Sequence, residues 1–172
     1  MARMSQITLA TPKMGFSAGH FTVFNATERE ALHGHNYQVS LTLCTRLGEE
    51  GLNYDYRIYK NKVYDLCKRF NLFFLLPEQS PYLTLEQMDD MIIAYFNGEK
   101  IPFLKKDVIT LPLTNITIEE LSRYFLEQIV GDETQLGKHG IVGVTVGVSN
   151  TPGTWGNCNW GTTSITDRDT VC

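Results

Sequence analysis

The stretch NYQVSLTLCTR, residues 36–46, is the part of this sequence that most constrains its fold. Large apolar side chains occupy every second position, namely Tyr37, Val39, Leu41 and Leu43. The positions between them are polar. A repeat of period two is typical of a strand that buries one face, as strands of antiparallel sheets do. The sequence LGEEG that follows predicts a turn that closes a hairpin.

Further strands are predicted on both sides of this one. Short β-prone residues from 6 to 24 predict a strand that runs into an irregular segment. Near the other end, GIVGVTVGVSN (residues 140–150) and the shorter NCNWGTTS (157–164) are also predicted strands. Between residues 82 and 113, MIIAYF and KIPFL flank Asn97-Gly98, a dipeptide that adopts the positive φ angles of a tight hairpin turn. We expect an inserted β-ribbon there.

Two helices are predicted between the strands. One helical face collects apolar residues at the spacing of an α-helix, at Tyr59, Val63, Leu66, Cys67 and Phe70. Asp55 is expected to cap this helix, and Pro77 is expected to end regular structure after it. Thr117 and Glu120 form a capping box for a second helix that runs to about Val130.

The order of these elements is strand, strand, helix, ribbon, helix, strand, strand, which is an α+β pattern. The length of 172 residues, with 42% hydrophobic residues, suits one domain over residues 1–172 with the ribbon inserted at about 82–113. Strand edges left open would pair with other chains, so oligomerisation is expected without a stoichiometry.

Charge and composition exclude several functions. A net charge of -4 and a pI near 5.5 leave no basic surface for nucleic acid or anionic lipid. No window approaches the roughly 18 apolar residues of a membrane span, and the first residues do not resemble a signal peptide. The four cysteines form no CxxC pair and are expected to be reduced thiols. We expect a soluble, cytoplasmic protein with a small-molecule substrate or a protein partner.

The stretch EREALHGHNY, residues 28–37, carries the strongest chemical motif. His33 and His35 flank one glycine, and on a strand both rings point to the same side, where they can chelate one metal ion. His20, at the end of the preceding strand, is the candidate third ligand. Three imidazoles with an open fourth position are typical of catalytic zinc, although iron and copper are not excluded. The alternative is a chance HxH pair with His20 in a turn, and the spacing leaves both open.

Two other polar residues, Glu30 and His139, are interpreted from the residues around them in the sequence. Glu30, three positions before His33, can act as a general base on a metal-bound substrate, or it can be one more solvated charge in TERE. His139, in LGKHG, is predicted to be a solvated loop residue.

These motifs carry a resemblance to a known family. FSAGH followed by EALHGHNYQVSLTL resembles the zinc-binding segments of the 6-pyruvoyltetrahydropterin synthase family, including its subgroup with glutamate in place of the catalytic cysteine. NYDYRIYKNKVYDLC resembles the start of the family's first helix, TNITIEEL its TxE start of the second, and VGVTVGVSNTP its penultimate strand. The resemblance therefore covers most of the chain, and the ribbon is similar in placement to an insertion in the glutamate subgroup.

The resemblance implies a fold and a set of site residues. The fold is the T-fold (tunnelling fold), an antiparallel sheet with two helices on one face whose strands close a barrel in a homo-oligomer, a trimer or hexamer. The implied residues are zinc ligands His20, His33 and His35, general base Glu30, and substrate-binding residues Thr117, Glu119 and Asn150. The implied cofactor is Zn2+, which makes the substrate's hydroxyl protons more acidic.

Two departures from the family put the substrate in question. The family's aspartate-histidine pair is replaced by Asn71 and Leu72, and its pterin-anchoring glutamate is replaced by Asn150. An amide offers one donor and one acceptor, so it cannot reproduce a carboxylate that faces two N–H groups, and such a buried mismatch costs about 1 to 3 kcal/mol. Trp155 and Trp160 can line an altered pocket or simply pack.

Three hypotheses follow. The leading one is a zinc-dependent lyase or isomerase with Glu30 as proton acceptor, acting on a pterin such as dihydroneopterin triphosphate, which the glutamate subgroup cleaves to 6-hydroxymethyldihydropterin. The second is a tailoring enzyme that uses zinc on a non-pterin substrate. The third is a non-catalytic zinc-binding pseudoenzyme. The sequence does not decide among them.

Overall fold

The computed structural model describes residues 3–52 and 54–162. The main sheet contains β1 (Arg3–Leu9), β2 (Gly15–His20), β3 (His33–Leu47), β4 (Phe73–Pro77), β8 (Val108–Leu111), β9 (Ile141–Thr151) and β10 (Thr154–Gly161). A second sheet contains β5 (Thr84–Gln87), β6 (Met91–Phe96) and β7 (Glu99–Leu104). The helices are α1 (Arg57–Phe70), α2 (Ile118–Val130), α3 (Glu133–Lys138) and the 3-10 turn η1 (Lys105–Asp107).

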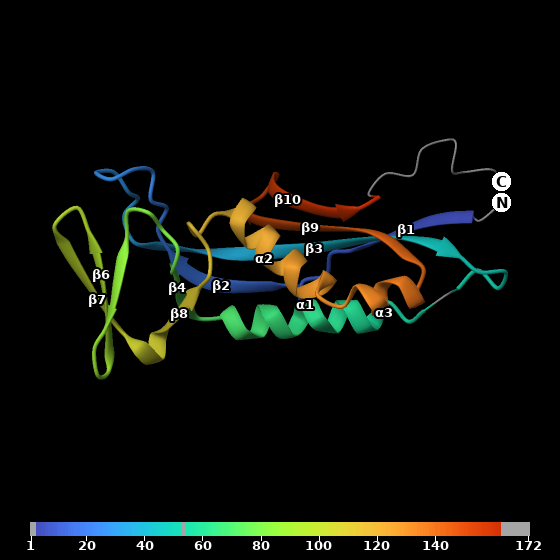
Figure 1. Cartoon of the computed structure of the whole chain (residues 1–172), viewed down its shortest axis with the longest axis horizontal. Helices are drawn as coiled ribbons and strands as arrows, with labels where there is room; N and C mark the ends of the chain where they lie inside the picture. Colours follow the sequence, from blue (N-terminus) through green and yellow to red (C-terminus); the bar gives the residue numbers. More distant parts are fainter. Residues whose placement is uncertain (1–2, 53, 163–172) are drawn as a thin grey trace.

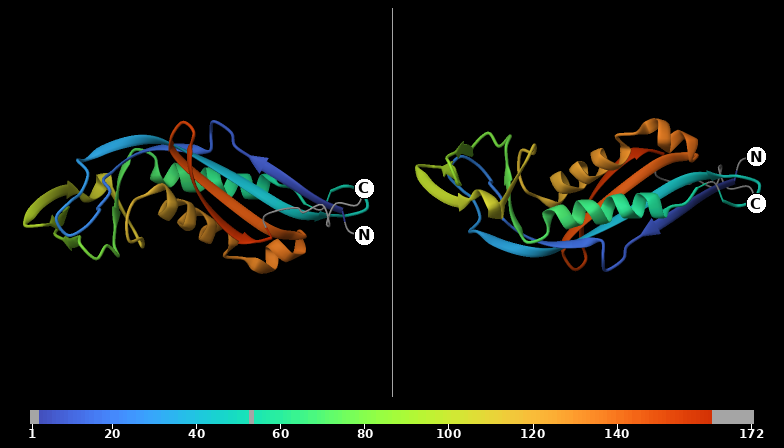
Figure 2. Two further views of the ribbon diagram at one scale, coloured as in Figure 1. Left: turned by 90° about the horizontal axis from the view of Figure 1, so that it is seen from above. Right: turned by 90° about the horizontal axis from the view of Figure 1, so that it is seen from below.

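The long strand β3 is the centre of the main sheet. The strand order is β10-β9-β3-β2-β4-β8, and β1 also pairs with β3. β2 pairs with the first part of β3 and β1 with the last part, while β9 lies along the other edge. Figures 1 and 2 show α1 and α2 on one face of this sheet, with the three-stranded sheet at one end of the elongated molecule.

The predicted alternation of β3 is confirmed. Its apolar side chains are buried to 1% exposure or less, at Tyr37, Val39, Leu41 and Leu43. They form the core together with valines of β9 and the apolar faces of α1 and α2. The alternate, polar side chains of β3 face away from the helices. One amphipathic strand therefore divides the molecule into a packed side and a polar side.

Both predicted helices are confirmed, with a small change at the start of α1. The predicted apolar face of α1 is buried. Its N-cap is Tyr56, one residue later than expected, although the carboxylate of Asp55 accepts a hydrogen bond from the Arg57 N–H at 2.9 Å. In α2 the Thr117 hydroxyl caps the Glu120 N–H at 3.3 Å, as predicted. Within the described residues, no helix is both long and apolar enough to cross a membrane.

Several expectations about the strands and helices were incomplete or wrong. The single strand predicted over residues 6–24 is two strands, β1 and β2. The LGEEG turn leads into α1 and closes no hairpin. FFLLP forms a strand that was not predicted, β4, which ends at Pro77 as expected. It runs parallel to β2 and β8, so the sheet is mixed and not purely antiparallel. A third helix, α3, lies between α2 and β9.

The three-stranded sheet is built around the predicted turn. Asn97 and Gly98 have φ values of 46° and 79°, the left-handed conformation that this dipeptide adopts readily. The predicted pair of strands, β6 and β7, is joined by a third, β5. This sheet shares a second core with the main body, made of Phe21, Val23, Leu76, Leu83, Ile92, Ala94, Phe96 and Val108. The three-stranded sheet is therefore packed against Phe21 and Val23, in the segment that follows β2.

Candidate metal centre

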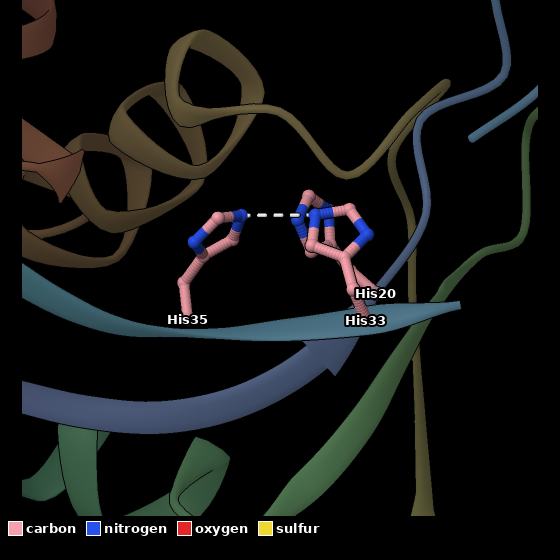
Figure 3. Close-up of side chains that lie close together, drawn as sticks. All are labelled: His20, His33 and His35. Carbon is pink, nitrogen blue, oxygen red and sulfur yellow. Dashed lines mark hydrogen bonds between the residues drawn. The ribbon is translucent and has the colours of Figure 1, made fainter. Parts of the chain in front are cut away.

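The three predicted histidines lie together where β2 ends and β3 begins. His20 and His33 are directly paired across the two strands, and His35 lies two residues further on the same face of β3. One nitrogen of each ring falls within 4.8 Å of the others, and the Nε2 atoms of His33 and His35 are 2.9 Å apart. Figure 3 shows the rings turned toward one another above the two strands.

Backbone carbonyl groups hold two of the rings from behind. The Nδ1 atom of His20 lies 2.8 Å from the carbonyl oxygen of Ile116, and that of His33 lies 2.8 Å from the carbonyl oxygen of Ala31. A carbonyl oxygen only accepts, so each Nδ1 carries a proton, and in the neutral form of the ring Nε2 then carries the lone pair. This is how proteins orient histidines that bind a metal through Nε2.

The donor set fits a divalent ion such as zinc. The Nε2 atom of His20 is buried and has no hydrogen-bond partner among the described residues, a costly situation that a bound cation would relieve. Burial lowers the pKa of His20 and outweighs the hydrogen bond to Ile116, which raises it. The nearby rings of His33 and His35 lower this pKa further. Burial and His33 also lower the pKa of His35. Neutral imidazole, the form that binds metal, is thereby favoured.

Glu30 borders this cluster. Its Oε2 atom accepts a hydrogen bond from the Thr22 N–H at 2.9 Å and lies 4.0 Å from the Nε2 atom of His33. Partial burial by itself raises the pKa of Glu30, but the hydrogen bonds from Thr22 and the nearby rings of His33 and His20 outweigh it and lower that pKa. An ionised carboxylate therefore stands beside the three rings at neutral pH.

The start of α2 reaches the cluster through its backbone. Thr117 follows Ile116, whose carbonyl group orients His20, and Glu119 lies in the first turn of the helix. A Cβ atom at Gly156 would lie 2.7 to 2.9 Å from backbone atoms of Ile118 and Glu119, so only glycine lets β10 pack this closely against α2.

Asn150 is half-buried near the end of β9. It follows Ser149, which pairs with Gln38 of β3. Within the described chain, no hydrogen bond joins Asn150 or the Glu119 side chain to the three histidines. The sequence prediction that these two residues bind substrate stays a prediction.

The segment after α1 contains no acid–histidine pair. Asn71 is the C-cap of α1, and its Oδ1 atom accepts a hydrogen bond from the Ser17 N–H at 2.9 Å. Leu72 has a φ of 69° and is 81% exposed. A leucine in a left-handed conformation with its side chain in solvent is unusual. The two side chains at this position cannot relay protons.

The sequence prediction was wrong about His139 and did not find Tyr37. His139 is half-buried as the C-cap of α3, with its Nδ1 atom 2.8 Å from the hydroxyl of Tyr59 and its ring stacked on Tyr54. Tyr37 lies on the same face of β3 as His35, with its ring centroid 5.8 Å away, and its buried hydroxyl has no partner among the described residues. The alternation of β3 already placed Tyr37 on that face.

Comparisons with known proteins agree on one family. Residues 10–159 match the family model described as 6-pyruvoyl tetrahydropterin synthase. A Methanocaldococcus jannaschii protein named "Putative 6-carboxy-5,6,7,8-tetrahydropterin synthase" is 27% identical over 135 residues, which are 78% of this chain and 82% of that protein. A Pyrococcus horikoshii protein of the same name is 24% identical over 115 residues, 66% of this chain and 68% of its own.

Solved structures give the same result. The 6-pyruvoyl tetrahydropterin synthase of Plasmodium falciparum superposes with a TM-score of 0.87 at 28% identity, over 93% of this chain and 99% of that one. The Plasmodium vivax enzyme superposes equally well, at 28% identity over the same shares of both chains. It was solved with a glutamate, described as a catalytic residue, replaced by alanine.

Proposed function

The chain belongs to the 6-pyruvoyl tetrahydropterin synthase family, and on this premise we propose that it is a zinc-dependent lyase acting on a pterin or a related heterocycle, with Glu30 as the general base. The family's T-fold is the fold of this chain, an α+β architecture with a mixed sheet and, over the residues that the structure describes, three helices. The proposal extends to a homo-oligomer, a trimer or hexamer with a closed barrel, and to a cytoplasmic location.

The observation that carries the proposal is the convergence of three histidine rings beside one carboxylate. His20, His33 and His35 would hold the ion through Nε2, because backbone carbonyl groups already take Nδ1 of His20 and His33. When bound, zinc acts as a Lewis acid that makes the hydroxyl protons of the substrate more acidic.

Glu30 would accept the proton that the substrate releases. Its lowered pKa makes the carboxylate a weak base, so it suits a proton that has already been made acidic. The Thr22 N–H fixes one carboxylate oxygen and leaves the group facing the histidines. The Plasmodium vivax relative, whose catalytic glutamate was replaced, supports this role for a glutamate in this fold.

Thr117, Glu119 and Asn150 are proposed to bind the rest of the substrate. If that substrate is dihydroneopterin triphosphate, side-chain cleavage gives 6-hydroxymethyldihydropterin. Asn150 favours a second candidate function, the conversion of a non-pterin heterocycle, because its amide matches a ring edge with one donor and one acceptor. The pseudoenzyme alternative has no observation of its own in its favour.

The base is tested with zinc-loaded protein and dihydroneopterin triphosphate, with products followed by chromatography. We expect Glu30→Gln to lower kcat by about 100-fold or more, the usual contribution of a general base, with unchanged zinc content. Glu133→Gln, an exposed acid of α3, is the matched control and should behave as wild type. Full turnover by Glu30→Gln would exclude Glu30 as the base.

Asn150→Glu separates the two substrate classes. A wild-type protein that ignores dihydroneopterin triphosphate, together with an Asn150→Glu variant that binds it, would establish the non-pterin candidate. Tight binding and turnover by the wild type would remove that candidate. Wild-type protein that holds zinc but converts neither a pterin nor any other hydroxylated heterocycle would leave the pseudoenzyme.

A further inference from the structure

The segment between β2 and β3, residues 21–32, folds into a small hairpin that carries Glu30; we call it the base hairpin. Val23 and Arg29 form a β-bridge in it. The Glu30 N–H donates to the Thr22 carbonyl at 2.9 Å, and the Thr22 N–H donates back to the Glu30 carboxylate at 2.9 Å. The backbone and side chain of Glu30 are therefore both fixed by the register of this hairpin.

One edge of the base hairpin is held by the main body of the protein. The side-chain amide of Asn115 accepts a hydrogen bond from the Val23 N–H at 3.1 Å and donates to the Val23 carbonyl at 2.8 Å, as a neighbouring strand would. The next residue is Ile116, whose carbonyl orients His20. Two consecutive residues, Asn115 and Ile116, therefore hold this edge of the base hairpin and the His20 ring.

The other edge is held by Arg29 and the three-stranded sheet. Arg29 donates one hydrogen bond to the Glu30 carbonyl at 2.8 Å and another to the carboxylate of Glu99, the first residue of β7, at 2.6 Å. Its guanidinium lies 5.4 Å from the ring centroid of Phe21 and 5.8 Å from that of Phe96. The Arg29 side chain is 18% exposed and the Glu99 side chain is 58% exposed, so water screens the contacts of Arg29 with Glu30 and the two rings less than it screens the Glu99 end.

We propose that Arg29 is a positioning residue, which joins the Glu30 backbone to Glu99 and so makes the three-stranded sheet the support that sets the Glu30 carboxylate against the histidine cluster. The contact spans 70 positions in the sequence and connects the base hairpin with the three-stranded sheet. Only the catalytic consequence of this inference rests on the proposed function; the support itself is a property of the fold.

The three-stranded sheet and the Glu30 segment also line a common cavity beside this contact. The cavity has a volume of about 290 Å3 and is lined by Glu30 and Ala31 on one side and by Phe96, Asn97 and Glu99 on the other. The turn between β6 and β7 thus forms a wall of the open space next to the base. A displaced turn would change the shape of this cavity and the packing beside the Glu30 segment.

The support is tested by amide hydrogen exchange on Glu99→Ala. We expect the Thr22 and Glu30 amides to exchange about tenfold faster, because opening of the base hairpin becomes easier, while the Val146 amide in β9 stays unchanged. The matched control is Glu86→Ala, which removes another exposed acid from the same sheet together with its hydrogen bond from Tyr95. Unchanged exchange at both amides in Glu99→Ala would refute the support.

The catalytic consequence is tested by turnover. Glu99→Ala is expected to lower kcat about tenfold through a misplaced base, with KM within about twofold and zinc content unchanged. Because Arg29 and Glu99 act as one unit, Arg29→Gln combined with Glu99→Ala should be no slower than Arg29→Gln alone. Additive losses, or a wild-type kcat in Glu99→Ala, would refute the positioning role.

The two proposals fail in different ways. If Glu30→Gln keeps full turnover, the proposed base is wrong, and the exchange experiment still decides whether Arg29 and Glu99 hold the hairpin. If Glu30→Gln abolishes turnover while Glu99→Ala exchanges faster without any loss of kcat, the support exists but does not position the base.

Discussion

Two groups of aromatic side chains that contain histidine lie at opposite ends of β3, and they differ in what the histidine rings contact. The histidine triad is His20, His33 and His35, at the start of β3. The His139 cluster is His139 with Tyr54 and Tyr59, and the carbonyl of His139 lies 3.4 Å from the hydroxyl of Thr45, near the end of β3. Both groups are partly or fully buried, so burial alone does not distinguish them.

The difference lies in the partner of the ring nitrogens. In the triad, backbone carbonyls take Nδ1 of His20 and His33, and the Nε2 atoms face one another. In the His139 cluster, Nδ1 meets the Tyr59 hydroxyl at 2.8 Å, and the ring stacks on Tyr54 with an interplanar angle of 9°. A ring held from behind with its other nitrogen directed at other imidazoles is arranged as a ligand, whereas a ring that faces a hydroxyl and a stacked tyrosine is arranged for packing.

The strongest test of this comparison is matched removal of one ring from each group. In His20→Asn the side-chain amide can still donate to the Ile116 carbonyl, but the Nε2 ligand is lost. We expect zinc content, measured by mass spectrometry after dialysis, to fall from about one ion per chain to less than about a tenth. His139→Asn should keep full zinc content. Equal zinc content in wild type and His20→Asn would remove the triad as the metal centre.

Zinc removal is the second test, and its effect is measured as a change in the free energy of unfolding. At a free zinc concentration about 100 times Kd, binding should raise the free energy of unfolding by about 2.7 kcal/mol, because the ion binds the folded chain. His20→Asn should gain none of this, and His139→Asn should gain all of it. Denaturant unfolding at one protein concentration, with and without a chelator, measures the difference. A similar gain in His20→Asn would place the ion elsewhere.

Acid gives a third and smaller effect, which arises from two rings of the triad, His20 and His35. The pKa values of His20 and His35 are lowered in the folded chain, so between those values and 6.5 the unfolded chain binds more protons. Stability of the zinc-free protein is therefore complete above pH 6.5 and declines as the pH falls through that window. The lowered pKa of Glu30 acts only below its ordinary value of 4.5. In His20→Asn the decline between pH 7.5 and 5.5 should be shallower, as measured by denaturant unfolding at each pH.

The sequence predicted the residues of the triad better than their surroundings. The strand alternation around residue 37 already put His33 and His35 on one face, and the short connection from β2 brought His20 beside them. The carbonyl of Ile116 carried no signal, because it comes from a segment 96 positions away and every residue has a carbonyl. The same holds for the pair of Arg29 and Glu99, whose side chains meet only after the three-stranded sheet has packed.

The errors in the fold have a similar physical origin. FFLLP is a continuous apolar run with no alternation, and such a run does not distinguish a buried strand from the end of a helix. Its parallel pairing with β2 and β8 depends on the path of the chain through α1 and the three-stranded sheet. His139 stands in a glycine-rich, polar stretch, so local composition predicted solvent, but Tyr59 approaches it from 80 positions away.

Removal of the Tyr59 hydroxyl tests the His139 cluster with the smallest effect. Tyr59→Phe keeps the ring in the core and its edge contact with Tyr54 at 5.7 Å, but it takes away the partner of His139 Nδ1. Because His139 is only half-buried, water can replace part of the lost hydrogen bond, so we expect a loss of about 0.5 to 1.5 kcal/mol in the free energy of unfolding. Zinc content and turnover should match wild type, since the triad lies at the other end of β3. A loss of zinc in Tyr59→Phe would mean that the two ends of β3 are coupled, and the division between a ligand group and a packing group would no longer hold.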